Sequence, residues 1–297
     1  MPPLTAPFPY FGGKKTVAPI VWSALGNPYY YIEPFCGSAA VLLARPHKPS
    51  HEIIGDLDCF LVNFWRAMKH GPDLTASYAD HLNSQADMNA RHKYLIASKA
   101  SLSAKIKADP EYYDAKCAGY WVYGASLWIG SGWTKSESDT IQHLHHPQGI
   151  FTSRRRDIAG TFQKLSLRLR NVAVVNSSWE QTCSTPSTID SDCGVFFDPP
   201  YSAEAGRDNN IYANEDLSVA HDVRAWCIQN ENRCKIVLAG YEGEHNELQA
   251  RGWRVVAWKA KGGYAHNGKK KGAGDVNRHR ERLWISPRCE TAQGSLY

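Results

Sequence analysis

The chain has 297 residues, of which 43% are hydrophobic and 21% are charged, and these values exclude wholesale disorder. A chain of this length can bury a large core, arranged as one domain with an insertion or as two domains. The formal net charge is +5, the first residues form no apolar signal segment, and no apolar run is long enough for a membrane span, so we expect a cytoplasmic protein.

Eight cysteines occur in the chain without a CxxC pair. Because a protein of this size does not need a disulfide scaffold, we expect free thiols and no structural zinc. The segment HLHHP, His143–Pro147, is rich in metal-ligating side chains. It has no partner ligands at a recognisable spacing, so no metal site is predicted.

Seven short runs of apolar or β-branched residues predict the strands of a sheet. The runs are Tyr29–Phe35, Glu52–Asp56, Asn171–Asn176, Gly194–Phe197, Lys235–Gly240, Trp253–Trp258 and Arg282–Ser286. Helix patterns follow or separate most of them, for example at Ser38–Ala44, Leu217–Gln229 and Glu244–Ala250. Strands that alternate with helices predict an α/β fold with an open, mainly parallel sheet.

The alternation breaks once, between the second and third predicted strands. Apolar residues have helical spacing in Phe60–Met68, and a long polar helix pattern covers Ala86–Lys107. The stretch Gly119–Trp133 has too many aromatic residues and glycines to predict a plain helix. We therefore predict a mainly helical insertion over residues 59–170, and a core formed by residues 1–58 and 171–297.

Positive charge is concentrated in two segments. Lys259–Arg282 contains eight Lys or Arg residues and two acids, and its glycines favour a mobile basic loop that contacts phosphates. Arg154–Arg156, followed by Lys164, Arg168 and Arg170, forms a second basic cluster. A solvated charged loop is the alternative for the first segment, but the two segments together favour a polyanionic partner.

Two of the predicted strands end in residues suited to ligand binding. The first continues into IEPFCGSAA, Ile32–Ala40, where Gly37 lets the backbone approach a ligand. The second ends in GDLD, and Asp56 lies 23 residues after Glu33, about the spacing of an acid that accepts from ribose hydroxyls. A helix N-cap is the alternative role for Asp56. Since open α/β sheets bind ligands at the carboxyl ends of their strands, these residues predict a shared site.

The fourth predicted strand ends in GVFFDPPYS, Gly194–Ser202. Pro199 and Pro200 have a fixed φ and no N–H, so the turn is stiff, and its carbonyls and the Asp198 carboxylate are acceptors without competing donors. Tyr201 adds an aromatic face beside them. This combination suits a flat ligand that carries an amino group, and a purely structural proline turn is the alternative.

The order and content of these motifs resemble the Dam-like, D12 class of DNA adenine-N6 methyltransferases. PYFGGKK (Pro9–Lys15) resembles the N-terminal cofactor motif of that class, EPFCGSAA the methionine-side glycine motif, GDLD the ribose motif and DPPY the catalytic motif. The resemblance implies a Rossmann-like, seven-stranded, S-adenosylmethionine-dependent methyltransferase core with an inserted, mainly helical target-recognition domain. DPPY also occurs in RNA methyltransferases. The motifs FGGK and EPFxG in front of it make the assignment to the D12 class more specific.

The resemblance also implies site residues. Asp198 and the Pro199 carbonyl would accept from the amino group of a flipped adenine, and Tyr201 would stack on its ring, without a metal. The implied catalytic residues are Asp198, Pro199, Pro200 and Tyr201. The implied contacts to S-adenosyl-L-methionine are Tyr10, Phe11, Gly12, Gly13, Lys14, Glu33, Pro34, Phe35, Cys36, Gly37, Ser38, Asp56, Ser178 and Asp198. The expected DNA contacts are Lys269, Lys270, Lys271, Arg154, Arg155 and Arg156.

The chain departs from the D12 pattern at three positions. Ala39 stands where a second glycine is usual, and Asp58 stands where Asn is common. Ser178 occupies the place of an Asp near the cofactor adenine, which leaves the adenine contact to Ser178 or to a backbone group.

The expected activity is site-specific methylation of adenine N6 in double-stranded DNA, in a bacterial or phage-infected cell. A cognate restriction endonuclease would be a further partner in a restriction-modification system. An RNA-directed adenine-N6 methyltransferase and a non-catalytic nucleic-acid-binding protein of the same fold are the alternatives. The long insertion argues against the first, and the intact Asp198 and Tyr201 argue against the second.

Overall fold

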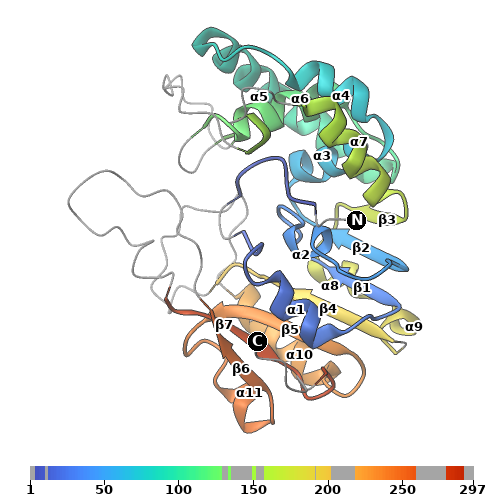
Figure 1. Ribbon diagram of the computed structural model, residues 1–297, viewed down its shortest axis with the longest axis vertical. Helices are drawn as coiled ribbons and strands as arrows, with labels where there is room; N and C mark the ends of the chain where they lie inside the picture. Colours follow the sequence, from blue (N-terminus) through green and yellow to red (C-terminus); the bar gives the residue numbers. More distant parts are fainter. Residues whose placement is uncertain are drawn as a thin grey trace, which may run out of the picture.

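The computed structural model describes residues 4–10, 13–128, 133–134, 149–151, 157–190, 192–201, 218–258 and 279–290. Within these residues seven strands form one sheet in the order β3-β2-β1-β4-β5-β7-β6 (Figure 1). The strands are β1 (Tyr30–Glu33), β2 (His51–Gly55), β3 (Val172–Val175), β4 (Cys193–Phe197), β5 (Lys235–Tyr241), β6 (Arg254–Ala257) and β7 (Glu281–Ile285).

Neighbouring strands from β3 to β5 run parallel, and β7 runs antiparallel to both β5 and β6. The predicted seven-stranded, mainly parallel sheet is therefore confirmed. Each strand overlaps one predicted run, because the strands are short segments rich in apolar or β-branched residues. The residues at the strand ends differ slightly from the prediction, since pairing with neighbours decides where a strand stops.

Helices connect the strands and cover the sheet. They are α1 (Ala18–Leu25), α2 (Ala40–Leu43), α3 (Cys59–His70), α4 (Pro72–Ala79), α5 (Gln85–Ala108), α6 (Ala115–Ala125), α7 (Ile158–Leu169), α8 (Trp179–Thr182), α9 (Pro186–Ile189), α10 (Val219–Asn230) and α11 (Glu247–Ala250), with the 3-10 helix η1 (Gly149–Phe151). Four of the longer helices begin at side chains that accept from a first-turn N–H, which satisfies one of the free donors of each helix. These N-caps are Asp58, Ser84, Asp114 and Asp157.

The two faces of the sheet pack against different helices, since alternate side chains of a strand point to opposite sides. Phe196 of β4 belongs to a core cluster with side chains of α1, α2 and α3. Its neighbours Val195 and Phe197 belong to a second cluster with side chains of α8, α10 and α11. Two apolar layers therefore hold the sheet in place.

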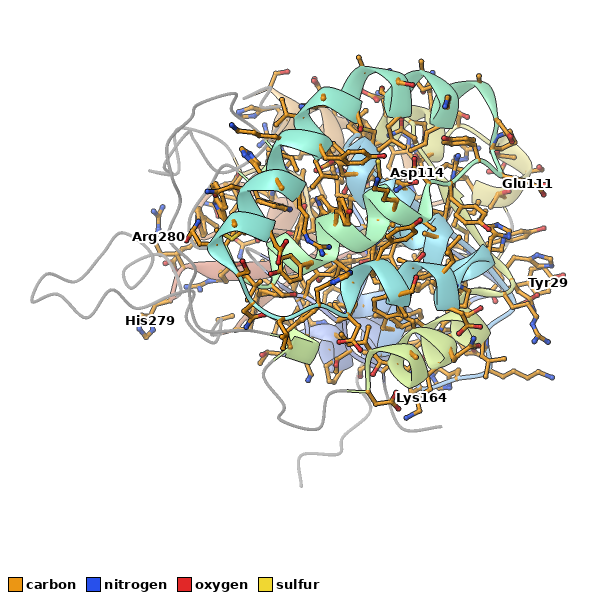
Figure 2. All side chains as sticks on the ribbon, turned by 90° about the horizontal axis from the view of Figure 1, so that it is seen from above. Tyr29, Glu111, Asp114, Lys164, His279 and Arg280 are labelled. Carbon is orange, nitrogen blue, oxygen red and sulfur yellow. The ribbon has the colours of Figure 1, made fainter. Side chains whose placement is uncertain are left out.

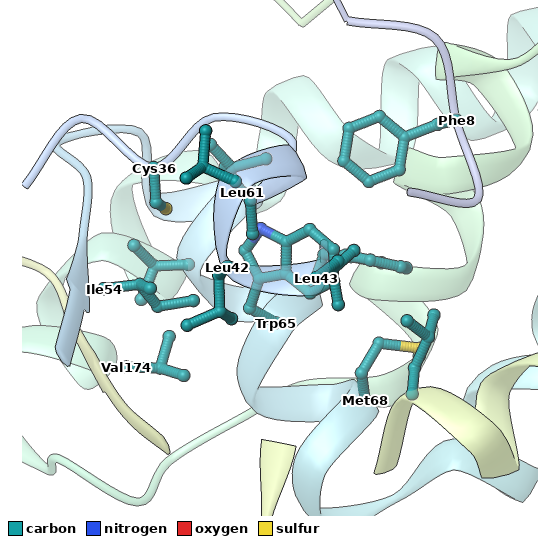
Figure 3. Close-up of a cluster of buried hydrophobic side chains, with 14 of the residues drawn as sticks. Phe8, Cys36, Leu42, Leu43, Ile54, Leu61, Trp65, Met68 and Val174 are labelled. Carbon is teal, nitrogen blue, oxygen red and sulfur yellow. The ribbon is translucent and has the colours of Figure 1, made fainter. Parts of the chain in front are cut away.

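The helices from α3 to α7 lie together beyond the β3 edge of the sheet (Figure 1). They share the first core cluster with the sheet. Figure 3 shows Trp65 of α3 among side chains of the sheet (Ile54, Val174), of α2 (Leu42) and of the N-terminal segment (Phe8). The helical layer and the sheet are thus joined through a continuous apolar core.

Polar side chains of α3 cover the edge strand β3. Arg66 Nε donates to the Val174 carbonyl at 3.0 Å, and Lys69 Nζ donates to the Val172 carbonyl at 2.9 Å. Arg66 Nη1 also donates to the Asp109 carbonyl at 2.9 Å, just after α5. Acceptors at a sheet edge invite pairing with another chain, and α3 satisfies two of them internally.

The glycine- and aromatic-rich stretch Gly119–Trp133 was not expected to form a plain helix, but its first part lies in α6. This expectation was wrong for residues 119–125, because the glycines allow close packing. A Cβ at Gly119 would lie 2.5 Å from Tyr78 Cβ, and one at Gly124 would lie 1.7 Å from the Trp133 ring. Tertiary contacts with α4 and with Trp133 outweigh the low helix propensity of glycine.

Arg168 was counted with Lys164 and Arg170 in a basic cluster that meets a polyanion, and the structure corrects this for Arg168. Its guanidinium binds Glu52 of β2 through two hydrogen bonds of 2.5 and 2.8 Å, and Arg45 binds the same carboxylate at 3.1 Å. Lys164 and Arg170 are exposed, and Figure 2 shows Lys164 at the outer edge of α7. A buried carboxylate needs positive partners, and α7 supplies one of them.

Two further features concern the described residues alone. None of their helices is long and apolar enough to cross a membrane, and no three His, Cys, Asp or Glu side chains among them are grouped closely enough to hold a metal ion. The segment His143–Pro147 lies outside these residues. The eight cysteines, which all lie within them, are free and buried.

The Arg168–Glu52 pair predicts a stability effect. Arg168→Ala should lower the free energy of unfolding by about 3 kcal/mol, because Glu52 stays buried with one positive partner fewer. Urea unfolding measures this loss. Arg170→Ala is the control, since Arg170 is exposed at the C-terminal end of α7. Equal effects of the two substitutions would contradict the anchoring role of Arg168.

Candidate active site

The carboxyl ends of β1, β2 and β4 meet at one edge of the sheet, since these neighbouring strands run parallel. The strand order reverses at β1 and β4, where open α/β sheets bind ligands. A cavity of about 970 Å³, including its open mouth, lies there. Its lining residues are Tyr10, Gly13, Lys14, Glu33, Pro34, Phe35, Cys36, Gly37, Ser38, Ala40, Asp56, Leu57, Asp58, Trp179, Phe196, Asp198, Pro200 and Val219.

The loops that follow β1 and β2 are fastened to each other. The Cys36 N–H donates to the Gly55 carbonyl at 2.9 Å, and the Gly37 N–H donates to Asp56 Oδ2 at 3.2 Å. From α3, Trp65 Nε1 donates to the Gly37 carbonyl at 3.0 Å. These bonds fix the backbone that forms one wall of the cavity.

Gly37 allows the N-terminal segment to reach this wall. Its φ is +45°, and a Cβ on it would lie 2.5 Å from the ring of Tyr10. The ring therefore occupies the space that any other residue at position 37 would fill. Ala39, which stands where a second glycine is usual, has a φ of +48° and carries backbone strain of roughly 1 kcal/mol.

Glu33 ends β1 with a buried carboxyl group. Its Oε2 accepts from the Tyr31 hydroxyl at 2.9 Å and from the Leu42 N–H at 3.1 Å. Burial raises the pKa of Glu33 to about 8, although these two hydrogen bonds oppose the shift. The carboxylates of Asp198 and Glu52 also contribute to this rise in pKa. Positive charge near Glu33 would favour its ionised form.

Asp56 follows β2 and accepts two backbone hydrogen bonds, from Gly37 at 3.2 Å and from Asp58 at 2.9 Å. Burial raises its pKa to about 7, against the effect of these N–H groups, and the Asp58 carboxylate adds to the rise. The N-cap that was the alternative role for Asp56 belongs to Asp58, whose Oδ1 accepts from the Phe60 N–H at 2.9 Å. The Asp56 carboxylate thus stays at the cavity wall.

Ser178 lies next to the cavity but is not one of its lining residues. Its side chain accepts from the Gln181 N–H at 3.4 Å in a capping box at the start of α8. The next residue, Trp179, lines the cavity, and its ring meets that of Phe197 edge to face. An aromatic wall therefore stands at the place where the sequence suggested a hydroxyl.

The DPPY segment forms the wall opposite the β2 loop. Asp198 Oδ1 binds Lys14 Nζ at 2.9 Å, and Pro200 also lines the cavity. Phe196 lies two residues before Asp198 and so shares its side of the strand. The ion pair joins the GGKK segment near the N-terminus to the end of β4.

Tyr201 is 9% exposed and does not line the cavity. Its hydroxyl donates to Glu281 Oε2 at 2.7 Å and lies 3.3 Å from Asp198 Oδ1. Its ring meets Tyr241 edge to face, with the ring centroids 4.5 Å apart.

Burial alone would lower the pKa of Lys14, but the carboxylates of Asp198 and Glu281 outweigh it and the pKa is raised. Lys14 therefore remains a cation.

Four carboxylates and one ammonium line the cavity within the described part of the chain: Glu33, Asp56, Asp58, Asp198 and Lys14. Such a lining favours a cationic ligand. The aromatic rings of Tyr10, Phe35 and Trp179 offer faces for a flat ring system. The cavity can thus hold a ligand that combines positive charge with an aromatic ring.

Several of the predicted residues fall outside the structural description. Phe11 and Gly12 of the N-terminal motif, Lys269, Lys270 and Lys271, and Arg154, Arg155 and Arg156 lie outside the described residues. Pro199 is buried and, like Ser178 and Tyr201, is absent from the lining.

Sequence reasoning missed Ala40, Leu57, Asp58, Trp179, Phe196 and Val219. Leu57 and Trp179 adjoin a predicted residue along the chain, and Ala40, Asp58 and Phe196 lie two residues from one, so proximity was the signal that could have found them. Val219 begins α10, beyond residues 202–217, and only the fold brings it to the cavity.

A family model described as D12 class N6 adenine-specific DNA methyltransferase matches residues 10–242, more than half of the chain. The match covers the segments that line the cavity from Tyr10 to Val219. No curated protein matches the chain in sequence.

The contact between Tyr10 and Gly37 generates a prediction. Gly37→Ala should destabilise the protein by about 2 to 4 kcal/mol, because the new Cβ overlaps the Tyr10 ring and φ is left-handed. Gly243→Ala is the matched control, since Gly243 has a φ of +90° with nothing within 4 Å of its Cβ position. It should cost only about 1 to 2 kcal/mol of backbone strain. Thermal and urea unfolding compare the two, and equal losses would disprove the packing role.

Proposed function

The chain belongs to the D12 class of N6 adenine-specific DNA methyltransferases, and on this premise we propose that it methylates adenine N6 at a specific site in double-stranded DNA, with S-adenosyl-L-methionine as donor. The observation that carries the proposal is the acidic cavity at the joined ends of β1, β2 and β4. The site residues that follow are part of the proposal.

The residues present fit this cofactor. S-adenosylmethionine combines a sulfonium and an ammonium with an adenine ring, and the cavity offers four carboxylates with aromatic rings. When bound, the cofactor would supply the electrophilic sulfonium methyl group that is transferred to adenine N6. Glu33 and the loop from Pro34 to Ser38 would hold the methionine part, and Asp56 would hold the ribose.

Trp179 is better placed than Ser178 to contact the cofactor adenine. The Ser178 side chain already caps α8, whereas Trp179 is one of the residues that line the cavity. A ring contact needs no acceptor, which would account for the absence of the usual Asp in this chain. Tyr10, Gly13 and Lys14, with Phe11 and Gly12 between them, would close over the cofactor from the N-terminal segment.

Asp198 and the Pro199 carbonyl would bind the amino group of the target adenine. An exocyclic amine is a poor nucleophile because its lone pair is delocalised into the ring. Two acceptors at the amine hydrogens would let the nitrogen become pyramidal and direct the lone pair at the methyl carbon. The gain comes from positioning and local electrostatics.

The adenine must leave the duplex to reach this place, so base flipping is part of the proposal. Tyr201 would provide the stacking face, although its ring is 9% exposed and packs on Tyr241, so that stacking requires it to move. The helices α3 to α7 would serve as the target-recognition domain. Lys269, Lys270, Lys271 and Arg154, Arg155, Arg156 would contact phosphates.

Expression of the chain in a host that lacks adenine methylation tests the function. Single-molecule sequencing should find N6-methyladenine in one sequence context, and Asp198→Ala should reduce transfer per folded molecule by roughly a thousandfold, since its contacts matter most in the transition state. The control is Asp192→Ala, because Asp192 is exposed at the other end of β4. Full activity in a folded Asp198→Ala protein would contradict the role of Asp198, and methylation of RNA instead of DNA would favour the RNA-directed alternative.

The raised pKa values of Glu33 (about 8) and Asp56 (about 7) predict pH-dependent cofactor binding. A cationic ligand prefers the ionised carboxylates, so protons compete with it and its affinity should rise by about tenfold from pH 6 to 7.5, while the ligand ammonium stays protonated. Calorimetry in buffers of different ionisation enthalpy should show proton release. Glu33→Gln should flatten the profile, and an affinity that falls over this range would contradict the assignment.

A further inference from the structure

Glu281 opens β7 with a buried carboxyl group beside the DPPY segment. It is 6% exposed, and a carboxylate at such a place requires partners. Its Oε2 accepts from the Tyr201 hydroxyl at 2.7 Å, and the Lys14 ammonium is its favourable charged neighbour. Its position is fixed by the sheet, where it lies opposite Tyr241 of β5.

Lys14, Asp198, Tyr201 and Glu281 form one polar network. Lys14 Nζ lies 2.9 Å from Asp198 Oδ1, and the Tyr201 hydroxyl lies 3.3 Å from the same atom. The hydroxyl therefore lies between the two carboxylates and donates at the shorter distance to Glu281. The network contains two negative groups and one positive group, all largely buried, and the sequence motifs account for every member except Glu281.

The charges around the network are also defined. Glu244, in the turn after β5, is a second negative neighbour of Glu281. Arg280 places its guanidinium 5.2 Å from the centre of the Tyr241 ring. Lys14 lies 5.4 Å from the centre of the Tyr201 ring and 5.7 Å from that of Trp258. Lys14 is thus the cation that the two carboxylates share.

We propose that Glu281 is a positioning residue for methyl transfer: it shares the Lys14 ammonium with Asp198 and holds the Tyr201 hydroxyl, so that Asp198 keeps acceptor capacity for the adenine amine. This inference rests on the proposed function of Asp198. Glu281 acts through Lys14 and Tyr201 and does not itself touch the substrate.

The contacts of Asp198 give the physical reason. Within the described part of the chain, both of its side-chain contacts, to Lys14 and to Tyr201, fall on Oδ1. Oδ2 is therefore the oxygen left for the amine. Without the charge of Glu281, the buried ammonium would draw more of the Asp198 carboxylate charge to itself and weaken Asp198 as an acceptor. A second carboxylate limits this effect.

A double-mutant cycle on the full-length chain tests the proposal. The variants are Glu281→Gln, Lys14→Met and the double variant, with Glu242→Gln as control because Glu242 has 62% of its side chain exposed and pairs with Arg282. Gln at position 281 can still accept from the Tyr201 hydroxyl, so the substitution removes charge and keeps shape. Tritiated-methyl transfer gives kcat and KM, and thermal unfolding gives stability.

Two results are expected. Glu281→Gln should lower kcat about tenfold, with KM for cofactor and DNA within about twofold, while Glu242→Gln changes neither. In the otherwise unaltered protein, Glu281→Gln should lower the melting temperature, because Lys14 loses a counterion. In the Lys14→Met background its effect on the melting temperature should have the opposite sign, because two buried carboxylates then face each other without Lys14. There Glu281→Gln should raise the melting temperature by about 2 °C or more.

Unchanged kcat in a folded Glu281→Gln protein, or stability losses that simply add in the double variant, would overturn the proposal. If Lys14→Met does not fold alone, folding of the double variant supports the coupling and failure of both contradicts it. Absence of methyl transfer by the unaltered chain would defeat the proposed function, and the stability cycle would still decide whether Glu281 and Lys14 act together.

Discussion

The buried ion pair between Lys14 and Asp198 connects two parts of the site that lie far apart in the sequence. It fastens the N-terminal segment to the end of β4. Because the pair lies at one side of the cavity, Tyr10 and Gly13 come to line it as well. The pair requires further partners, since two desolvated charges are rarely stable alone. Tyr201 and Glu281 supply them, and β7 thereby becomes part of the site's support.

Excess negative charge is the second constraint on the cavity. Burial raises the pKa of Glu33 and of Asp56, and neighbouring carboxylates add to the rise: Asp198 and Glu52 act on Glu33, and Asp58 acts on Asp56. A cation relieves this repulsion when it binds. The proposed sulfonium donor carries such a positive charge before methyl transfer, and its thioether product does not.

The helical layer depends on the sheet as much as the sheet depends on it. Arg66 and Lys69 satisfy carbonyls of the edge strand β3, and Arg168 neutralises Glu52 of β2. These contacts set the position of α3 and α7, from which the other helices of the layer follow. Charged side chains that look like surface cations in the sequence therefore have internal roles here.

The sequence by itself determined the seven strands, their alternation with helices and the motifs at three strand ends, because short apolar runs and stiff turns act locally. Tertiary structure alone decided that the glycine-rich part of α6 is a helix, that Arg168 points inward, and that Trp179 in place of Ser178 lines the cavity. It also brought Glu281 to Tyr201. Each of these depends on a contact between residues distant in the chain, and periodicity, propensity and motif spacing carry no information about such contacts.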